Sequence, residues 1–394
     1  MSFSQALSGL SAANENITVI GNNIANSQTY GFKSQSPQFA DVYAGSQVGQ
    51  GVQVAGVAQD FSNGTLETTS QPLDLAINGQ GFFQLRQGNQ TVYSRNGQLT
   101  LNANGSIVNS SGAQLMGFPA GVGSGSTPVA LQVPTTGMAA APTTTAASAV
   151  NLDANSAAIN PVATPFNPNN AATYSYASTG TVYDSLGNQH TLTLYYTKTA
   201  ANTWSVQGTM DGTTLPQTGT LAFNTNGTLN TAASTPPTFA FTPTDGAAPM
   251  TVATTFSGTT QTGNDNALTA FQQNGNAAGS LTGVSFSSNG DLTGSYSNGQ
   301  TQTLGTVALA NFADPNGLTP VSGNAWQATP ASGQALLGTA GTGELGQLET
   351  GTLEDSNVDL ATQLVDLIQA QSDYQANAQT VKTQDAILQT AVQM

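Results

Sequence analysis

Amphipathic helical patterns occupy both ends of the chain, and they constrain the fold more than any other feature of the sequence. Positions at alternating spacings of four and three are mostly apolar from Phe3 to Ile24, and again from Leu360 to Val392. One row of each pattern is interrupted, by Asn14 and Gly21 in the first and by Gln371 and Asp385 in the second. This spacing predicts one helix with an apolar stripe at each end. A helix of about 25 residues with polar interruptions in its stripe is marginal in water, so each helix needs a partner.

We predict that the two terminal helices pair with each other as a coiled coil, which makes everything between them a nested insertion. The alternative is that each helix packs separately on the domain next to it. A capping-box pattern, Ser356 followed by Asp359, predicts the start of the C-terminal helix. The predicted seam and assembly residues are apolar or aromatic: Phe3, Leu7, Leu10, Ile17, Ile24, Leu360, Leu364, Leu367, Tyr374, Ala378, Val381 and Leu388.

Between the helices the sequence predicts β-structure. Three stretches, 99–107, 221–229 and 284–292, share a template of alternating apolar residues, Asn-Gly and a further apolar residue. Because Asn-Gly supplies the positive-φ residues of a tight hairpin turn, each stretch predicts a two-strand unit. Two segments rich in Pro, Thr, Ala, Ser and Asn, 119–172 and 231–266, predict loops or long connections.

The predicted fold class is therefore mainly β with α-helical termini, arranged as nested discontinuous domains. We expect four parts: a terminal coiled-coil domain of 1–27 with 356–394, a connecting segment of 28–70 with 340–355, an inner β domain of 71–146 with 286–339, and an outer inserted β domain of 147–285.

The charge and composition of the 394-residue chain exclude several classes of function. Charged residues make up 6% of the sequence, against about 25% in a typical globular protein. With a net charge of −15 and five basic residues, the chain has no patch that could neutralise a row of phosphates, so we expect no nucleic-acid partner. No stretch approaches the apolar length of a membrane span, and we expect no membrane insertion.

Residues for catalysis or metal binding are scarce. The chain has no cysteine and one histidine, His190, so neither a histidine-based triad nor a zinc site of the usual ligand sets can be assembled. His190 follows a Gly-Asn turn, where a surface residue is the usual outcome. The glycine-rich segments 121–126 and 338–346 do not lead into the helix that a phosphate loop requires. We therefore predict no enzyme activity, no catalytic residues, no cofactor and no metal.

Three segments resemble the rod and hook proteins of the bacterial flagellum. The stretch SGLSAANENITVIGNNIANSQTYGFK (8–33) is similar to the N-terminal signature of that family, 61–83 to the segment that opens its first β domain, and 353–390 to its C-terminal helix. The motif residues are Asn22, Asn23, Ile24, Ala25, Asn26, Thr29, Gly31, Phe32 and Lys33.

Rod proteins of that family are shorter, so the inserted segment 147–285 favours a hook subunit. The resemblance implies a structural protein that is exported by the flagellar type III apparatus without a cleavable signal. It would polymerise with itself into a curved, flexible tube that links rod to filament and transmits torque. Its other partners would be rod, hook-cap and hook–filament junction proteins, and its location extracellular, in the flagellum. The alternatives are a distal rod subunit and, less favoured, a secreted β-rich adhesin.

The asparagines of the motif suggest how such a subunit would make contacts. An amide bonds in several directions without bringing charge into an interface. We therefore expect Asn22, Asn23 and Asn26 to tie the helix end to neighbouring subunits, with helix capping or turn formation as the alternative.

Overall fold

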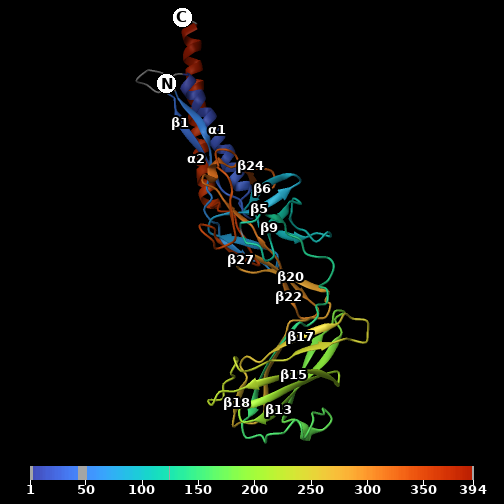
Figure 1. The fold of residues 1–394 in the computed structure, drawn as a ribbon. Coiled ribbons are helices and arrows are strands. Elements are labelled where there is room, and N and C mark those ends of the chain that lie inside the picture. The colour runs from blue at the N-terminus through green and yellow to red at the C-terminus, as the bar shows by residue number, and fades with distance from the viewer. Residues whose placement is uncertain (1–2, 43–50, 124, 393–394) are drawn as a thin grey trace. The chain divides into compact units, whose positions relative to one another are not determined.

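The two terminal patterns form the two α-helices of the structure, a computed structural model that describes residues 3–42, 51–123 and 125–392. Helix α1 (Phe3–Ala25) and helix α2 (Leu360–Val392) pack side by side in opposite directions (Figure 1). Gly9 lies against Asn377, while Asn23 near the other end of α1 bonds Gln363 near the start of α2. The predicted pairing of the termini is confirmed. Neither helix, within its described residues, combines the length and apolarity needed to cross a membrane.

The predicted start of the C-terminal helix is wrong by one turn. Helix α2 begins at Leu360 because Asp359 is its cap: the Asp359 carboxylate accepts from the backbone N–H of Ala361 at 2.9 Å and of Thr362 at 3.3 Å. An acidic side chain at this position also complements the helix dipole. The Ser356 hydroxyl instead accepts from the N–H of Val358 and forms a turn before the helix.

By its contacts the chain divides into two units. Unit 1 comprises residues 1–135, 283–294 and 301–394, and unit 2 comprises 136–282 and 295–300. In unit 1, residues from the two halves of the chain pair directly. Strand β3 (Leu66–Thr68) pairs with β28 (Thr352–Glu354), and β4 (Leu75–Asn78) pairs with β27 (Gln347–Thr350), both antiparallel. The hairpin of β1 (Gln35–Asp41) and β2 (Val52–Gln59) contacts α1.

The largest sheet of unit 1 follows the order β20-β21-β22-β9-β5-β6-β25-β24, with five short strands attached. Its core contains Phe82, Tyr93, Phe312 and Trp326, whose rings meet edge to face. The strands are β5 (Phe82–Gln87), β6 (Gln90–Ser94), β7 (Leu99–Leu101), β8 (Ile107–Asn109), β9 (Gln114–Pro119), β10 (Val129–Ala130), β20 (Leu281–Phe286), β21 (Asp291–Tyr296), β22 (Thr301–Val307), β23 (Leu309–Asn311), β24 (Thr319–Val321), β25 (Ala325–Gln327) and β26 (Leu336–Gly338). A short 3-10 helix spans Pro315–Gly317.

Unit 2 contains two sheets around one apolar core. One sheet is an antiparallel meander of β12 (Tyr176–Tyr183), β13 (Gln189–Ala200), β14 (Thr203–Met210) and β15 (Thr213–Ala222). The other has the order β16-β17-β11-β18, with β19 also paired to β11. Its strands are β11 (Thr145–Asp153), β16 (Thr238–Phe241), β17 (Met250–Thr255), β18 (Thr260–Thr262) and β19 (Ala267–Gln273). Trp204 and Tyr196 are the largest core side chains, and a 3-10 helix spans Ala171–Thr173.

The expectation of loops over 119–172 and 231–266 is wrong in part. Strand β11 lies in the first segment and pairs with three other strands, and β16, β17 and β18 lie in the second. The burial of β11 alternates along its length. Its inward positions include Ala146 and Ser148 as well as Val150, so the apolar alternation that signals a strand is weak in the sequence.

The three Asn-Gly templates form tight turns as predicted, but the expectation that Asn as well as Gly has a positive φ is wrong. In the first, the N–H of Asn102 bonds the carbonyl of Ser106, and the N–H of Gly105 bonds the carbonyl of Asn102. The same two bonds recur at 224–228 and 287–291. Only the glycines have positive φ, between 78° and 85°, which identifies a three-residue hairpin loop with a glycine bulge rather than the two-residue turn. In the second template, pairing beyond the turn is limited to Phe223 and Leu229.

We predict that Gly227→Ala destabilises unit 2 more than Gly258→Ala. Both glycines have a φ of 81°, which costs an alanine about 1–2 kcal/mol. A Cβ on Gly227 would also overlap the carbonyl oxygen of Gln261, whereas on Gly258 it would make an ordinary 3.7 Å contact with Ala149. Thermal unfolding followed by circular dichroism measures both losses. Equal losses in the two variants would contradict the steric argument.

Candidate functional site

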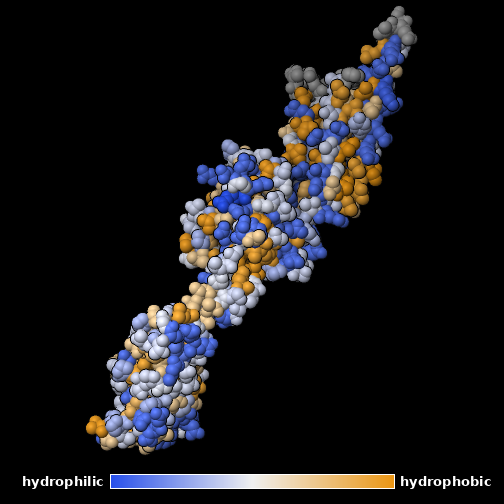
Figure 2. Space-filling model, turned by 90° about the vertical axis from the view of Figure 1, so that its right-hand side faces the viewer, coloured by the Kyte–Doolittle hydropathy of each residue, from blue (hydrophilic) through white to orange (hydrophobic). Residues whose placement is uncertain are grey.

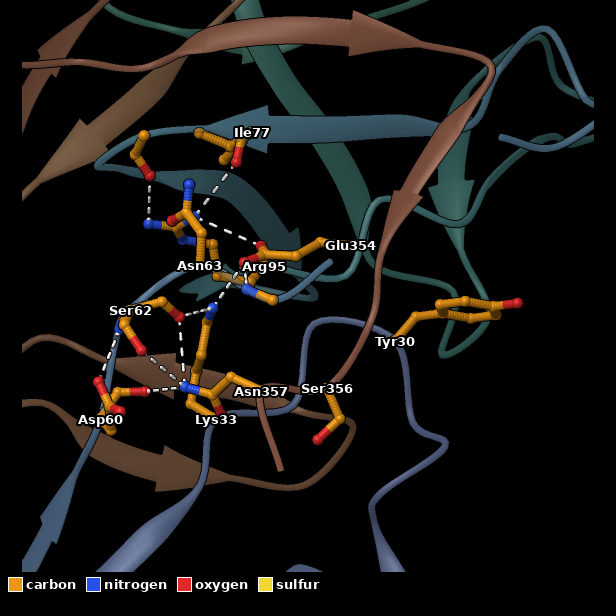
Figure 3. Close-up of polar contacts among 12 residues, drawn as sticks. Tyr30, Lys33, Asp60, Ser62, Asn63, Ile77, Arg95, Glu354, Ser356 and Asn357 are labelled. Carbon is orange, nitrogen blue, oxygen red and sulfur yellow. Dashed lines mark hydrogen bonds and ion pairs between the residues drawn. The ribbon is translucent and has the colours of Figure 1, made fainter. Parts of the chain in front are cut away.

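The segment that follows α1 enters a buried cluster of three charged side chains. Lys33 Nζ lies 2.6 Å from Glu354 Oε1, and Arg95 Nη1 lies 3.3 Å from Glu354 Oε2. The side chains of Lys33 and Glu354 are fully buried, and 2% of the Arg95 side chain is exposed. Figure 3 shows both cations pointing at the same carboxylate. The cluster joins three segments of unit 1: the end of the N-terminal motif, the residue after β6, and the end of β28.

Backbone groups complete the cluster. Lys33 Nζ donates to the carbonyl of Ser62 at 2.6 Å, and the N–H of Gly64 donates to Glu354 Oε1 at 3.0 Å. Arg95 Nη2 donates to the carbonyl of Gly79 at 2.9 Å, and its guanidinium lies over the ring of Phe82. A fourth segment, 62–64, is therefore tied to the other three.

The cluster buries two positive charges against one negative charge. Burial lowers the pKa of Lys33 and of Arg95, because it penalises the charged form, and Glu354 opposes this effect at both residues. Removing one partner from a buried ion pair typically costs about 3–5 kcal/mol, since the other charge is left without compensation. Glu354 is the residue on which both cations depend.

Gly31 and Asn357 align the two chain segments beside the cluster. The N–H of Gly31 donates to the backbone carbonyl of Glu354 at 2.7 Å. Gly31 has a φ of 68°, and a Cβ on it would lie 2.6 Å from the backbone of Arg95, so this position requires glycine. The Asn357 amide accepts from the N–H of Ser34 and donates to the carbonyl of Asp60, each at 2.8 Å (Figure 3).

The motif asparagines bond mostly within the chain. Asn23 is buried; its amide donates to the carbonyl of Gln35 and to Gln363 Oε1, and it accepts from the N–H of Gln35. Asn26 donates to the carbonyl of Asn22 and finishes α1. The expectation that all three bond neighbouring subunits is therefore wrong for Asn23, whose amide is used at the junction of α1, β1 and α2. Asn22 is exposed.

The other motif residues lie around the same junction. Phe32 is buried, Ile24 and Thr29 are half-buried, and Ala25 is exposed. Thr29 Oγ1 donates to Asn26 Oδ1. The Tyr30 hydroxyl donates to Glu67 at 2.9 Å, and this hydrogen bond with the adjacent negative charge raises the pKa of Tyr30.

One row of the helix contact lies one residue before the predicted row. Ala6, Ala13 and Ile20 are buried on α1, each one position before Leu7, Asn14 and Gly21 of the predicted spacing, and Ala370 is buried on α2 next to Gln371. Ala12, Val19 and Asn23 of α1 are buried as well. The predicted row contains polar residues and glycine, whereas the buried row one residue earlier contains alanine and isoleucine. The small residues also allow the helices to approach closely at Gly9.

The predicted seam residues divide into two groups. Half-buried residues border the contact: Leu10, Ile17, Ile24, Leu367, Ala378 and Val381. The other group has at least 41% of each side chain exposed: Leu7, Leu360, Leu364, Tyr374 and Leu388. The side chain of Phe3 lies outside the described residues. Figure 2 shows apolar side chains at the surface of the helical part of the chain. The role of these residues in assembly stays a prediction.

Sequence reasoning did not find Arg95 or Glu354 as site residues. Both lie outside the motif, and their approach depends on pairing between strands at opposite ends of the chain. The one signal in the sequence is the small number of basic residues: Lys33 and Arg95 are two of only five in a chain of net charge −15.

Comparison with known proteins assigns the whole chain to one family. Family models match in four segments: "Flagella basal body rod protein" over 4–33, "Flagellar hook protein FlgE/F/G D1 domain" over 76–183, "Flagellar basal body protein FlaE D2 domain" over 151–276, and "Flagellar basal body rod FlgEFG protein C-terminal" over 349–394. The flagellar hook protein FlgE of Escherichia coli K12 is 48% identical over 100% of both chains. The chain belongs to the flagellar hook protein family.

More distant members of the hook protein family agree. The flagellar hook protein FlgE of Brucella suis is 32% identical over 98% of this chain and 97% of its own. The crystal structure of Helicobacter pylori flagellar hook protein FlgE2 shares the fold, with a TM-score of 0.55 and 14% identity over 72% of this chain and 99% of that one. The hook interpretation of the sequence is confirmed: the chain is a structural subunit of the flagellar hook.

We predict that Glu354→Ala lowers the free energy of unfolding of unit 1 by about 3–5 kcal/mol, because Lys33 and Arg95 stay buried without a counter-charge. Arg86→Ala is the control. Arg86 bonds Gln114 at the exposed surface, and its removal should cost under about 1 kcal/mol. Urea unfolding followed by tryptophan fluorescence measures both, with Trp326 reporting on unit 1 and Trp204 on unit 2. A loss at Glu354 no larger than at Arg86 would mean that the cluster does not stabilise the unit.

Proposed function

We propose that the chain polymerises into a curved, flexible tube that links the rod to the filament and transmits torque. One observation supports this most directly: the paired helices use small residues for their mutual contact and leave large apolar side chains exposed. On α2, 66% of Val365 and 65% of Ile368 are exposed, and Leu364 and Leu388 are also exposed. Burying one such side chain contributes about 1.5–3 kcal/mol, so contact with neighbouring subunits is favourable.

The low charge of the chain suits repeated self-association. A surface made mainly of Ser, Thr, Asn, Gln and Gly loses less hydration free energy on burial than an ionic surface does. A net charge of −15 spread over 394 residues with 6% charged residues leaves few ionic contacts to be screened. The polymer should therefore depend on burial of apolar area more than on ion pairs.

We further propose the nested domain organisation, with 147–285 at the outside of the tube. Unit 2 has its own apolar core, drawn from both of its sheets, and the D2-domain model matches 151–276 within it. The helices, the ion cluster and the strand pairs β3–β28 and β4–β27 all belong to unit 1. This division supports assembly through unit 1.

The same proposal includes the partners and route that the family resemblance implies. These are rod, hook-cap and junction proteins, export by the flagellar type III apparatus, and an extracellular location in the flagellum. The distal rod and adhesin alternatives are not favoured, because the relatives that match the full chain are named as hook proteins.

We predict that Val365→Ser with Ile368→Ser abolishes tube formation without changing the melting temperature of the monomer. Both side chains are exposed in the single chain, so they stabilise only the polymer. Gln369→Ser with Gln371→Ser is the matched control, since these residues are also exposed on α2 and their change to Ser costs at least as much helix propensity as the change of Val or Ile to Ser. Light scattering and electron microscopy after addition of ammonium sulfate, which strengthens apolar burial, distinguish the two. Normal tubes from the first variant would exclude this face of α2 from assembly.

We predict that a chain lacking residues 142–275 still assembles. Ala141 and Asn276 form an antiparallel bridge, so a two-residue Asn-Gly turn can join them without disturbing unit 1. The shortened chain should be monomeric and folded in low salt and form thinner tubes under the same precipitating conditions. If it is folded but never polymerises, unit 2 makes contacts that assembly requires and the nested scheme is wrong.

A further inference from the structure

His190 lies in unit 2 with both ring nitrogens facing carboxylates. Nδ1 is 2.6 Å from Asp211 Oδ2, and Nε2 is 3.3 Å from Asp184 Oδ2, while only 10% of the histidine side chain is exposed. A neutral imidazole carries a single N–H, so only the protonated ring can donate to both aspartates. The geometry therefore favours a positively charged His190.

Asp184 is held in its ionised form by the turn that contains it. Its side chain is fully buried, and Oδ1 accepts from the backbone N–H of Leu186 at 2.8 Å and of Asn188 at 2.9 Å. Oδ2 accepts from the side-chain amide of Asn188 at 3.1 Å. Burial raises the pKa of Asp184, but the bonds from Asn188, His190 and Leu186 outweigh it and lower the pKa to about 2. The carboxylate is a permanent negative charge beside the ring.

Asp211 approaches the other side of the ring from the β14–β15 turn. Asp211 and Gly212 have φ values of 50° and 80° and form the two-residue Asp-Gly turn that is favoured in hairpins. Asp211 Oδ1 accepts from the N–H of Thr191 at 2.8 Å, next to the bond from His190. The Asp211 carboxylate thus ties this turn to β13.

A third turn, from the other sheet of unit 2, reaches the same place. The amide of Asn188 donates to Asp245 Oδ2 at 2.7 Å, and the Ser185 hydroxyl accepts from the N–H of Ala248 at 2.9 Å. The ring of Phe241 packs edge to face on His190, with 5.3 Å between centroids. The aspartates that face this site are thus Asp184, Asp211 and Asp245, one from each turn. The side-chain amide nitrogen of Asn188 donates to two of these carboxylates, those of Asp184 and Asp245.

The Asp184 turn also packs on the two segments that lead into and out of unit 2. A Cβ on Gly187 would lie 2.9 Å from the Cβ of Ala140 and 3.2 Å from the Cα of Ala277. Close by, Ala141 and Asn276 form their antiparallel bridge. A movement of this turn would therefore change its packing against the segments at which the chain enters and leaves unit 2.

We propose that protonated His190 is a clasp that holds the β12–β13, β14–β15 and β16–β17 turns together, and that its deprotonation loosens this end of unit 2. Deprotonation removes one of the two donated hydrogen bonds and leaves Asp184 and Asp211 without the positive charge between them. If unit 2 lies on the outside of the tube, as the proposed function holds, this end of unit 2 would be exposed to the pH of the medium.

The direction of the effect follows from the charges. Burial opposes the charged ring, but the hydrogen bonds and negative charges of Asp211 and Asp184 outweigh it and raise the pKa of His190 above its ordinary 6.5. A raised pKa in the folded state means that the stabilisation is complete below about 6.5 and is lost as the pH rises through the folded value. The lowered pKa of Asp184 adds stabilisation above about 3.9 that is lost as the pH falls toward 2. The clasp is therefore strongest between these limits.

The test uses the full-length chain in its monomeric form. Because His190 is the only histidine, labelling histidine with ¹³C and ¹⁵N gives a single imidazole signal. We expect it to titrate above pH 6.5 in the parent and at lower pH in Asp211→Asn. Asp265→Asn, which removes the same charge at an exposed position of unit 2, should leave it unchanged. A titration at or below pH 6.5 in the parent would overturn the clasp.

Hydrogen exchange with mass spectrometry reports whether the proton holds the turns. After correction for intrinsic exchange, we expect protection of residues 184–191 to fall by about tenfold between pH 6 and 9, and by less in His190→Asn. A pH-independent protection in the parent would overturn the proposal. So would a shift of the Nε2 signal, with rising protection, on addition of equimolar zinc chloride, since the site would then be a metal site. Each measurement is made on the monomer, so failure of the clasp is separate from failure to polymerise.

Discussion

The burial of Glu354 between Lys33 and Arg95 is the interaction on which the arrangement of unit 1 depends. Lys33 and Glu354 are 321 residues apart in the sequence, and each charge of the cluster has an opposite charge beside it only if all three segments are in place. Strand pair β3–β28 brings Glu354 to the segment that follows α1. The cluster therefore holds the end of α1 near the start of α2. The contact between the two helices themselves consists largely of small side chains.

The presence of the terminal helices could be predicted because a period of 3.5 residues is a strong local signal. Their contact row could not, since the choice between neighbouring rows depends on the partner. The buried positions are Ala13 and Ile20 instead of the predicted Asn14 and Gly21 on α1, and Ala370 instead of Gln371 on α2. Spacing alone does not distinguish a large apolar residue that faces the partner helix from one that faces outward.

In the middle of the chain, too, local sequence patterns predict short-range structure but not long-range pairing. Hairpin turns at Gly105, Gly227 and Gly290 could be predicted from short motifs, because their bonds join residues within four positions. Strand β11 pairs with residues more than 100 positions away and has small and polar residues facing the core, so its sequence gave little sign of a strand. The ion cluster and the contacts of His190 have the same origin: each consists of residues that only the finished topology brings together.

The two faces of each terminal helix have different requirements, and this explains which residues occupy them. The inner face must let the helices approach, which alanine and glycine allow and large side chains prevent. Stability of the pair is then limited by the small area that alanines bury, and the cluster at Glu354 compensates by attaching both helices to the β-structure of unit 1. The outer face of α2 needs no contact within the chain, and it carries Val365 and Ile368. A monomer built in this way is held together by its junction, while its largest apolar side chains remain available to other subunits.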